Sequence, residues 1–128
     1  MNKYIPLKEL EVYQLSRELS RLAWGIYQEF SFEDKKVMGD QFVRSMDSVG
    51  ANIAEGYGRY HCLDRIRFYY NARASLHESC DHWLELLHER QKISLEKYKL
   101  MNSVKEKLSL KLSNFINATY KLSDNEKK

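Results

Sequence analysis

The sequence predicts an all-α protein that folds as an antiparallel up-down-up-down four-helix bundle. The chain has 128 residues, the size of one domain, and can bury roughly two thirds of its unfolded surface. A single proline, Pro6, and five glycines leave too few turn residues for an all-β sandwich. Apolar residues recur at helical spacing along four consecutive segments. Because the connections between these segments are short, neighbouring helices must run antiparallel, and residues 1–128 form one domain.

The first two helices are expected at about residues 7–30 and 33–57, each marked by apolar residues at steps of three and four. In the first helix these residues are Leu15, Leu19, Leu22, Ile26 and Phe30. In the second they are Met38, Phe42, Met46, Val49, Ile53 and Tyr57. Ser31 is suited to cap the second helix, with Asp34 where Glu or Gln would complete the usual capping box.

The last two helices are expected at about residues 63–91 and 94–122, with Ser94 as the N-cap of the last one. The apolar stripe of the third helix is Ile66, Tyr69, Ala72, Leu76, Cys80, Trp83 and Leu87. That of the fourth is Met101, Val104, Leu108, Leu112, Phe115, Thr119 and Leu122. Residues 123–128 are expected to be a frayed tail.

Cysteine usage and hydropathy indicate a cytoplasmic protein. Cys62 and Cys80 are 18 residues apart, or about 27 Å along one helix, which is too far for a disulfide. We expect two reduced thiols, as is usual in the cytosol. No apolar stretch of about 18 residues occurs, and Met1 to Leu7 is too short and polar for a signal peptide.

Two helices carry a second polar face besides the core stripe. At about 100° per residue these faces hold small and amide-bearing side chains rather than the usual mixture of Lys and Glu. On the second helix they are Ser45, Ser48, Asn52, Glu55 and Arg59, and on the third Asn71, Ser75 and Glu78. Gly25, Gly39 and Gly50 also lie inside helices, where each costs about 1 kcal/mol relative to Ala. Close approach of another helix would explain them.

The run from Asn52 to Arg59, NIAEGYGR, resembles the signature of the four-helix-bundle family of 23S rRNA-intervening-sequence proteins. The flanking residues that match are Arg44, Ser45, Ser48, Val49, Phe68, Ala72, Ser75, Leu76 and Glu78. The segment from Leu10 to Gln14, LEVYQ, is similar to the opening of that family, so the resemblance covers about residues 7–87. Gly50 departs from the family pattern, which usually has Pro, as do Asn71 and Arg73, where it has apolar or small residues.

The resemblance implies antiparallel four-helix bundles that assemble into homopentameric rings. Some members of the family are encoded inside insertions in large-subunit ribosomal RNA genes. The family is also similar to the accessory proteins of diversity-generating retroelements, barrel-shaped pentamers that engage a reverse transcriptase and nucleic acid.

The signature residues are a candidate oligomer cluster. Its members are Ser45, Ser48, Asn52, Glu55, Gly56, Arg59, Ser75 and Glu78. Polar groups one turn apart on two helices can form a hydrogen-bonded ladder across an interface, where an unmet group costs about 1 to 3 kcal/mol. Gly56 lets another backbone approach, and Arg59 can meet a carboxylate. The alternative reading is a ligand or nucleic-acid site.

Catalytic and metal chemistry are not expected. The third helix carries His77, Cys80, Asp81, His82, Glu85 and His88. A di-iron bundle needs inward carboxylates from all four helices and a second Glu-x-x-His, which the other helices lack. No Gly-rich phosphate loop, nucleophile elbow or Cys-x-x-Cys pair is present. We therefore expect no cofactor, no metal and no enzymatic activity.

Charge distribution favours a binding role instead. The net charge is +3, and residues 92–128 hold nine basic and four acidic side chains. Candidate nucleic-acid contacts are Arg65, Arg67, Arg73, Lys92, Lys99, Lys107 and Lys121. With Tyr69 and Tyr70 nearby, they could hold RNA or DNA through phosphate contacts and stacking.

The first functional hypothesis is a homo-oligomeric ring, a pentamer by resemblance, that is a scaffold for nucleic acid or a nucleic-acid enzyme. Repetition of weak contacts around a ring would strengthen such binding. The alternative is a protein-only interaction module of a mobile-element or retroelement system, with a reverse transcriptase or other protein as its partner.

Overall fold

The computed structural model describes residues 4–126, which contain helices and no strand. The elements in chain order are a 3-10 turn (Leu7–Glu9), α1 (Glu11–Gln28), α2 (Phe32–Asp34), a π-helical turn (Lys35–Gly39), α3 (Asp40–Tyr57), α4 (Cys62–Leu76), a second π-helical turn (His77–Trp83), α5 (Leu84–Glu89) and α6 (Leu95–Glu126). Because the π-helical turns join their neighbours without a break, α2 to α3 and α4 to α5 are two long helices. The all-α class with four long helices is confirmed.

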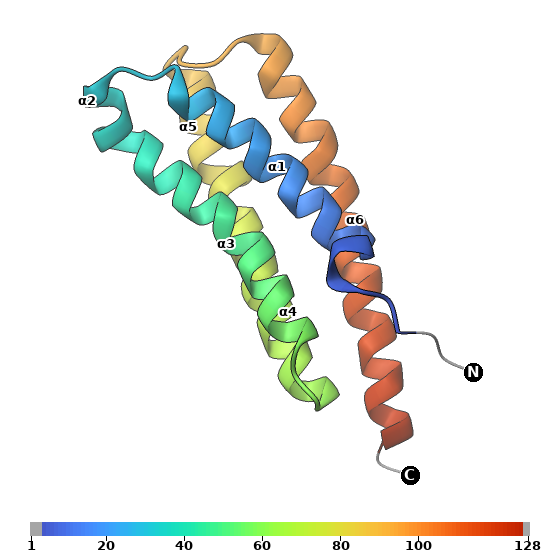
Figure 1. The fold of residues 1–128 in the computed structure, drawn as a ribbon. Coiled ribbons are helices and arrows are strands. Elements are labelled where there is room, and N and C mark those ends of the chain that lie inside the picture. The colour runs from blue at the N-terminus through green and yellow to red at the C-terminus, as the bar shows by residue number, and fades with distance from the viewer. Residues whose placement is uncertain (1–3, 127–128) are drawn as a thin grey trace.

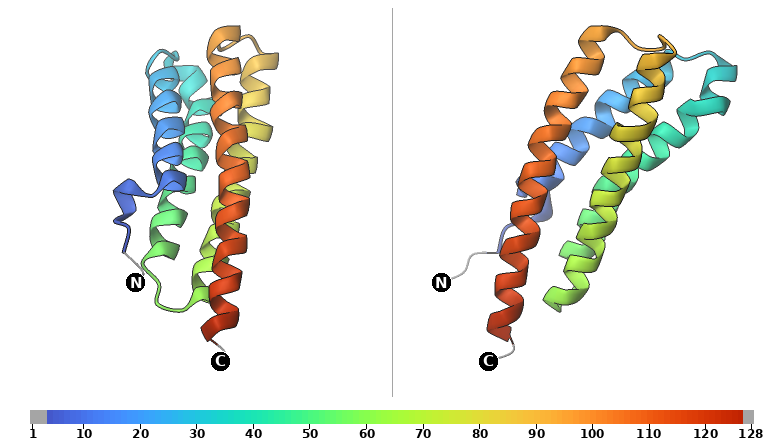
Figure 2. Two further views of the ribbon diagram at one scale, coloured as in Figure 1. Left: turned by 90° about the vertical axis from the view of Figure 1, so that its right-hand side faces the viewer. Right: turned by 180° about the vertical axis from the view of Figure 1, so that it is seen from behind.

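The four long helices pack side by side in the order α1, α3, α4 and α6, and α6 returns to contact α1. Figure 1 shows the connections that follow α1 and α5 at one end of the molecule and the α3 to α4 connection near the other. Figure 2 shows that α6 continues well beyond the start of α1. No helix within residues 4–126 is both long and apolar enough to cross a membrane.

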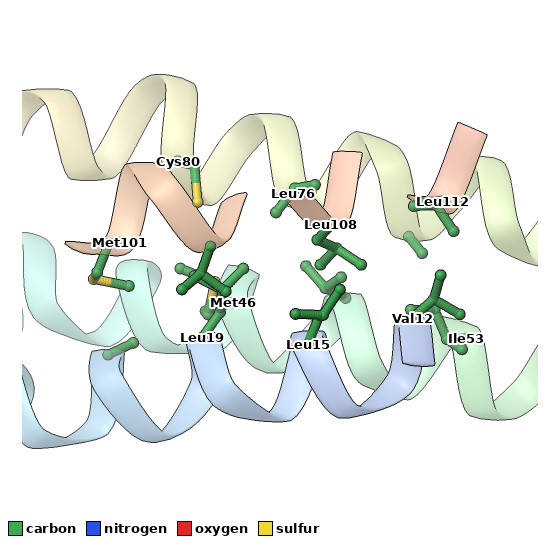
Figure 3. Close-up of a cluster of buried hydrophobic side chains, with 14 of the residues drawn as sticks. Val12, Leu15, Leu19, Met46, Ile53, Leu76, Cys80, Met101, Leu108 and Leu112 are labelled. Atoms are coloured by element: carbon green, nitrogen blue, oxygen red, sulfur yellow. The ribbon is translucent and has the colours of Figure 1, made fainter. Parts of the chain in front are cut away.

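Most residues of the predicted apolar stripes lie in the core (Figure 3), together with Val12, Ala23, Leu84 and Ile116, which the stripes omit. Leu19, Phe42, Tyr69 and Leu108 are fully buried, one from each long helix. The predicted stripe is off by one residue in two places. Leu84 and Ile116 are buried, whereas the predicted Trp83 and Phe115 are only partly buried, and Leu122 is 48% exposed while the adjacent Ser123 is buried. On α6 the buried face has thus turned by one residue from Ile116 onward.

The helix boundaries differ from expectation at both ends of the chain. The first helix begins at Glu11 rather than near Leu7, because Leu10 takes an extended conformation (φ −74°, ψ 122°). Leu10 is buried, and its carbonyl accepts a hydrogen bond from the Gln14 amide. At the other end, α6 continues to Glu126. Residues 123–126 are therefore helical rather than a tail, and 127–128 lie outside the described residues.

Two predicted helix caps are present. The Asp34 amide donates to Ser31 Oγ over 3.1 Å, and the Lys97 amide donates to Ser94 Oγ over the same distance. Each bond satisfies one of the amides that have no partner inside the first turn of a helix. The caps therefore set where the second and fourth helices begin.

Candidate functional site

Part of the signature cluster ties α3 to α4 within one chain. Ser48 Oγ of α3 lies 2.9 Å from Ser75 Oγ of α4. Asn52 Nδ2 donates to the Ser48 carbonyl over 2.9 Å and approaches Ser48 Oγ at 3.0 Å. All three side chains are partly buried. We call Ser48, Asn52, Ser75 and the neighbouring Gly56 the α3–α4 clasp.

Gly56 explains why α3 and α4 can approach so closely. A Cβ atom at Gly56 would lie 2.9 Å from Phe68 Cβ and 3.0 Å from the Arg65 carbonyl oxygen, both on α4. Real Cβ atoms essentially never approach another heavy atom this closely. The backbone that approaches Gly56 is therefore that of its own chain.

Of the other glycines inside helices, Gly39 and Gly50 have close neighbours and Gly25 has none. A Cβ at Gly50 would lie 2.9 Å from Ser16 Oγ, and one at Gly39 would lie 3.0 Å from the rings of Tyr27 and Phe30. Close packing inside the chain therefore accounts for both glycines, as the sequence predicts. Gly25 differs, because a Cβ there would have no atom within 4 Å beyond its own stretch of helix.

The outer members of the signature cluster make only local contacts. Glu55 pairs with Arg59 one turn later over 3.2 Å, and both side chains are about half exposed. The Arg59 guanidinium lies over the Phe68 ring. Glu78 accepts a 3.0 Å hydrogen bond from Trp83 Nε1, a five-residue spacing that the π-helical turn brings onto one side.

The expected ladder therefore forms only in part. The Ser48–Ser75 bond joins the two helices, whereas Glu55 and Glu78 face solvent with partners on their own helices. Ser45 is buried and donates to the Phe42 carbonyl over 3.0 Å, away from this ladder.

Two candidate nucleic-acid residues lie in structural positions. Arg65 Nε donates to the Arg59 carbonyl over 2.6 Å, which holds the α3 to α4 connection. Tyr69 is fully buried, and burial raises the pKa of its phenol well above the usual range. Tyr69 therefore belongs to the core and cannot stack on a base, contrary to the sequence-based hypothesis. Arg67 stays exposed and lies 3.7 Å from Asp64.

Tyr70 and Arg73 meet a residue that the sequence did not single out. The Arg73 guanidinium lies 4.7 Å from the centre of the Tyr70 ring. The Tyr70 hydroxyl lies 3.2 Å from the Tyr120 hydroxyl on α6, and the ring centres are 6.5 Å apart. Tyr70 is 37% and Tyr120 is 40% exposed. The pairing depends on the register of two helices 50 residues apart in sequence, which periodicity along one helix cannot reveal.

The candidate lysines behave differently from one another. Lys92 forms an ion pair with Asp34 over 3.0 Å and closes the end of the bundle. Lys99, Lys107 and Lys121 are exposed on α6, and none of them forms an ion pair with a side chain of residues 4–125. These three lysines are therefore available to a polyanion.

The histidines and carboxylates of the third helix contact one another and α6. Asp81 lies 2.6 Å from His77 Nδ1 and 2.9 Å from Lys105 Nζ on α6. Burial acts to raise the pKa of Asp81, but hydrogen bonds from Lys105 and His77 outweigh it and hold that pKa below its usual value. Glu85 accepts from the Tyr98 hydroxyl at 2.7 Å. In the part of the chain that the structure describes, no three His, Cys, Asp or Glu residues are grouped to hold a metal.

The two cysteines are thiols, and both are buried. Cys62 begins α4, and Cys80 lies in the π-helical turn of the same long helix. Burial raises the pKa of the Cys80 thiol to about 12. Since the thiolate is the nucleophile, a thiol held protonated in the core is suited to packing rather than to reaction.

Comparison with known proteins shows to which family the chain belongs. The model of the 23S rRNA-intervening sequence protein family matches residues 8–114. The chain belongs to this family. It is also similar to a solved structure from Bacteroides thetaiotaomicron, described as a protein with unknown function from the S23 ribosomal protein family. The two chains are 30% identical with a TM-score of 0.76, and the match covers 84% of this chain and 96% of the other. No curated protein matches the chain.

The 23S rRNA-intervening sequence match includes the α3–α4 clasp, Tyr70 and Arg73 but ends before Tyr120. The exposed Lys121 also lies beyond it. The resemblance could therefore direct attention to the signature residues, but not to the α6 half of the tyrosine pair.

Proposed function

We propose that the protein is a non-catalytic scaffold of the cytoplasm. Its subunit is an antiparallel up-down-up-down bundle, and the subunits assemble into a homo-oligomeric ring, a homopentamer as the family resemblance implies. The ring binds nucleic acid or a partner that processes nucleic acid. The observation that carries this proposal is the set of exposed, unpaired lysines on α6, Lys99, Lys107 and Lys121.

These lysines favour a polyanionic partner because each phosphate contact releases bound counterions. Ion pairs within the bundle already occupy Lys92, Lys97, Lys105 and Lys111. Lys99, Lys107 and Lys121 project from one long helix, and a ring would repeat them around its axis. Weak contacts repeated in this way act at a high effective concentration.

The position of Gly25 inside α1 is an argument for the proposed assembly of subunits. A helix-interior glycine costs about 1 kcal/mol relative to alanine, and within the described residues no atom outside the local helix backbone lies within 4 Å of a Cβ placed at Gly25. The position borders a groove of about 380 Å³ between α1 and α6, lined in part by Leu22 and Leu100. A neighbouring subunit that packs closely there would explain the glycine.

The protein-only alternative is favoured by exposed apolar side chains on another part of the surface. Trp24 is 51% exposed beside Tyr27, and the two line a shallow cavity of about 300 Å³ between α1 and α3. Exposed Trp and Tyr are enriched at protein interfaces. A reverse transcriptase or another protein partner could use this surface.

Two measurements on the purified protein test the two parts of the proposal, assembly and nucleic-acid binding. Light scattering on the purified protein at tens of micromolar measures the subunit number, with a pentamer expected and a monomer contradicting assembly. Titration with structured RNA and duplex DNA at two salt concentrations measures binding, which we expect to weaken steeply as salt rises. A triple Lys99→Gln, Lys107→Gln, Lys121→Gln variant should lose most of the salt dependence. Absence of any binding by the parent would favour the protein-only alternative.

A further inference from the structure

We propose that Tyr70, Arg73 and Tyr120 form a platform on which an unpaired base of single-stranded nucleic acid stacks. We call these three residues the tyrosine platform. The inference rests on the nucleic-acid binding proposed above and deepens it, because it names the form of nucleic acid that is preferred.

The geometry of the platform is fixed within the subunit. Tyr70 is on α4 and Tyr120 is on α6, which pack against each other. Their hydroxyls lie 3.2 Å apart, and their rings are inclined by 58°. The bond holds both rings in place while more than a third of each side chain stays exposed. A base that stacks on either ring therefore meets an ordered surface, which lowers the entropy cost of binding.

The charge at the platform suits a phosphate beside the stacked base. The Arg73 guanidinium lies on the Tyr70 ring at 4.7 Å and forms no ion pair within the described residues. Lys121 follows Tyr120 in sequence and is likewise exposed without an ion pair. Arg73 on α4 and Lys121 on α6 are therefore two exposed cations without an ion pair among the side chains that the structure describes. A polyanion is a better partner for these two cations than a neutral protein surface is.

The platform should discriminate between single and double strands. In a duplex the base faces are covered by their neighbours, and only the backbone and groove edges reach a protein surface. Stacking on an exposed aromatic ring therefore requires an unpaired base. The lysines of α6 can contact phosphates of either form, whereas the tyrosines add affinity only for the single strand.

The experiment compares three labelled probes by fluorescence anisotropy. They are an unstructured RNA of about 12 nucleotides, the DNA of the same sequence, and the same RNA annealed to its complement. The parent should prefer both single strands to the duplex, and the ratio of RNA to DNA affinity shows whether the ribose contributes. Tyr70→Ala and Tyr120→Ala should each weaken single-strand binding at least about fivefold, the low end of measured stacking effects, and leave duplex binding unchanged.

Two further variants separate stacking from charge and from fold. The double variant Tyr70→Phe, Tyr120→Phe keeps both rings and should retain most of the single-strand preference. Arg73→Gln should weaken binding to all three probes and lower the salt slope by about one. Trp24→Ala is the matched control, because it removes an exposed aromatic ring from α1, which does not neighbour α4 in the bundle. It should change no affinity.

Each contrary outcome identifies what fails. If the parent binds no probe, the proposed nucleic-acid function fails. If it binds single strands and duplex equally and the alanine variants match the parent, only the platform is overturned. If Tyr70→Ala instead changes the subunit number in light scattering and leaves probe affinity intact, the surface contacts protein and the platform is again overturned. Ultraviolet crosslinking of the parent to the RNA, mapped by mass spectrometry, needs no variant and should label Tyr70 or Tyr120.

Discussion

Ser48 of α3 and Ser75 of α4 place their hydroxyl oxygens 2.9 Å apart beside the core. Asn52 Nδ2 donates to Ser48 from one turn further along α3. The side chains that the family signature supplies on these two helices therefore join them within one subunit. This bond gives the α3–α4 clasp a structural role that does not require an oligomer.

The clasp predicts coupled effects on stability. Ser48→Ala and Ser75→Ala should each lower the free energy of unfolding by about 1 kcal/mol, since each leaves a partly buried hydroxyl without its partner. The double variant should cost less than the sum of the two single variants. Urea unfolding of all four proteins, with Ser109→Ala on α6 as a control outside the clasp, measures this coupling. Strictly additive losses would show that the two hydroxyls do not interact.

Two glycine substitutions should change stability in opposite directions. Gly56→Ala places a Cβ against Phe68 and the Arg65 carbonyl, and should lower the free energy of unfolding by about 1 to 3 kcal/mol. Gly25→Ala meets no neighbouring atom within 4 Å in the part of the chain that the structure describes and should stabilise the isolated subunit by up to about 1 kcal/mol. Thermal unfolding below the concentration of assembly measures both effects.

The same Gly25→Ala protein tests the proposed subunit contact. If a neighbouring subunit packs at Gly25, the variant should dissociate at a concentration where the parent remains assembled. Gly58→Ala is a suitable control, because a Cβ there would make only ordinary contacts with its own helix. Unchanged assembly of Gly25→Ala would place the interface elsewhere.

Alkaline conditions should destabilise the fold through Cys80. Burial raises the pKa of the folded thiol from 9.0 to about 12. Between these values the unfolded chain releases a proton that the folded chain keeps, so the contribution of Cys80 to stability should be lost as pH rises from about 9 to about 12 and is constant below this window. Tyr69 acts in the same direction, because burial also raises its pKa.

Urea midpoints measured across this range test the prediction. Cys80→Ala removes one of the ionising groups whose pKa is raised in the folded state and should reduce the slope without abolishing it. A parent whose stability is constant up to the highest pH would mean that the thiol is not held protonated in the core.

The variant Glu55→Ala tests whether the exposed signature residues stabilise the single subunit or the contact between subunits. The Glu55–Arg59 pair is about half exposed, and such pairs contribute about 0 to 1 kcal/mol. The variant subunit should therefore keep its helicity and nearly all its stability. If the pair lies in an interface, light scattering should show dissociation. Asp64→Ala, which breaks the similar Asp64–Arg67 pair, should leave assembly intact.

The core could be predicted from the sequence because burial follows the helical period. Phe42, Tyr69 and Leu108 lie on their stripes and are fully buried. The same rule fails at Leu122, because the buried face of α6 is displaced by one residue from Ile116 to Ser123. It fails again before Glu11, where a buried Leu10 takes an extended conformation that periodicity does not register.

Contacts between helices could be predicted from the sequence only in part. Periodicity along one helix places Ser48 and Asn52 on one face of α3, and Ser75 on one face of α4, because residues three or four apart share a side. It cannot place Ser48 against Ser75, decide that the space beside Gly56 is filled by α4 rather than by another chain, or bring Tyr120 to Tyr70. These contacts depend on how far one helix slides and turns against the next. That displacement is set by the packing of the whole core, to which every long helix contributes.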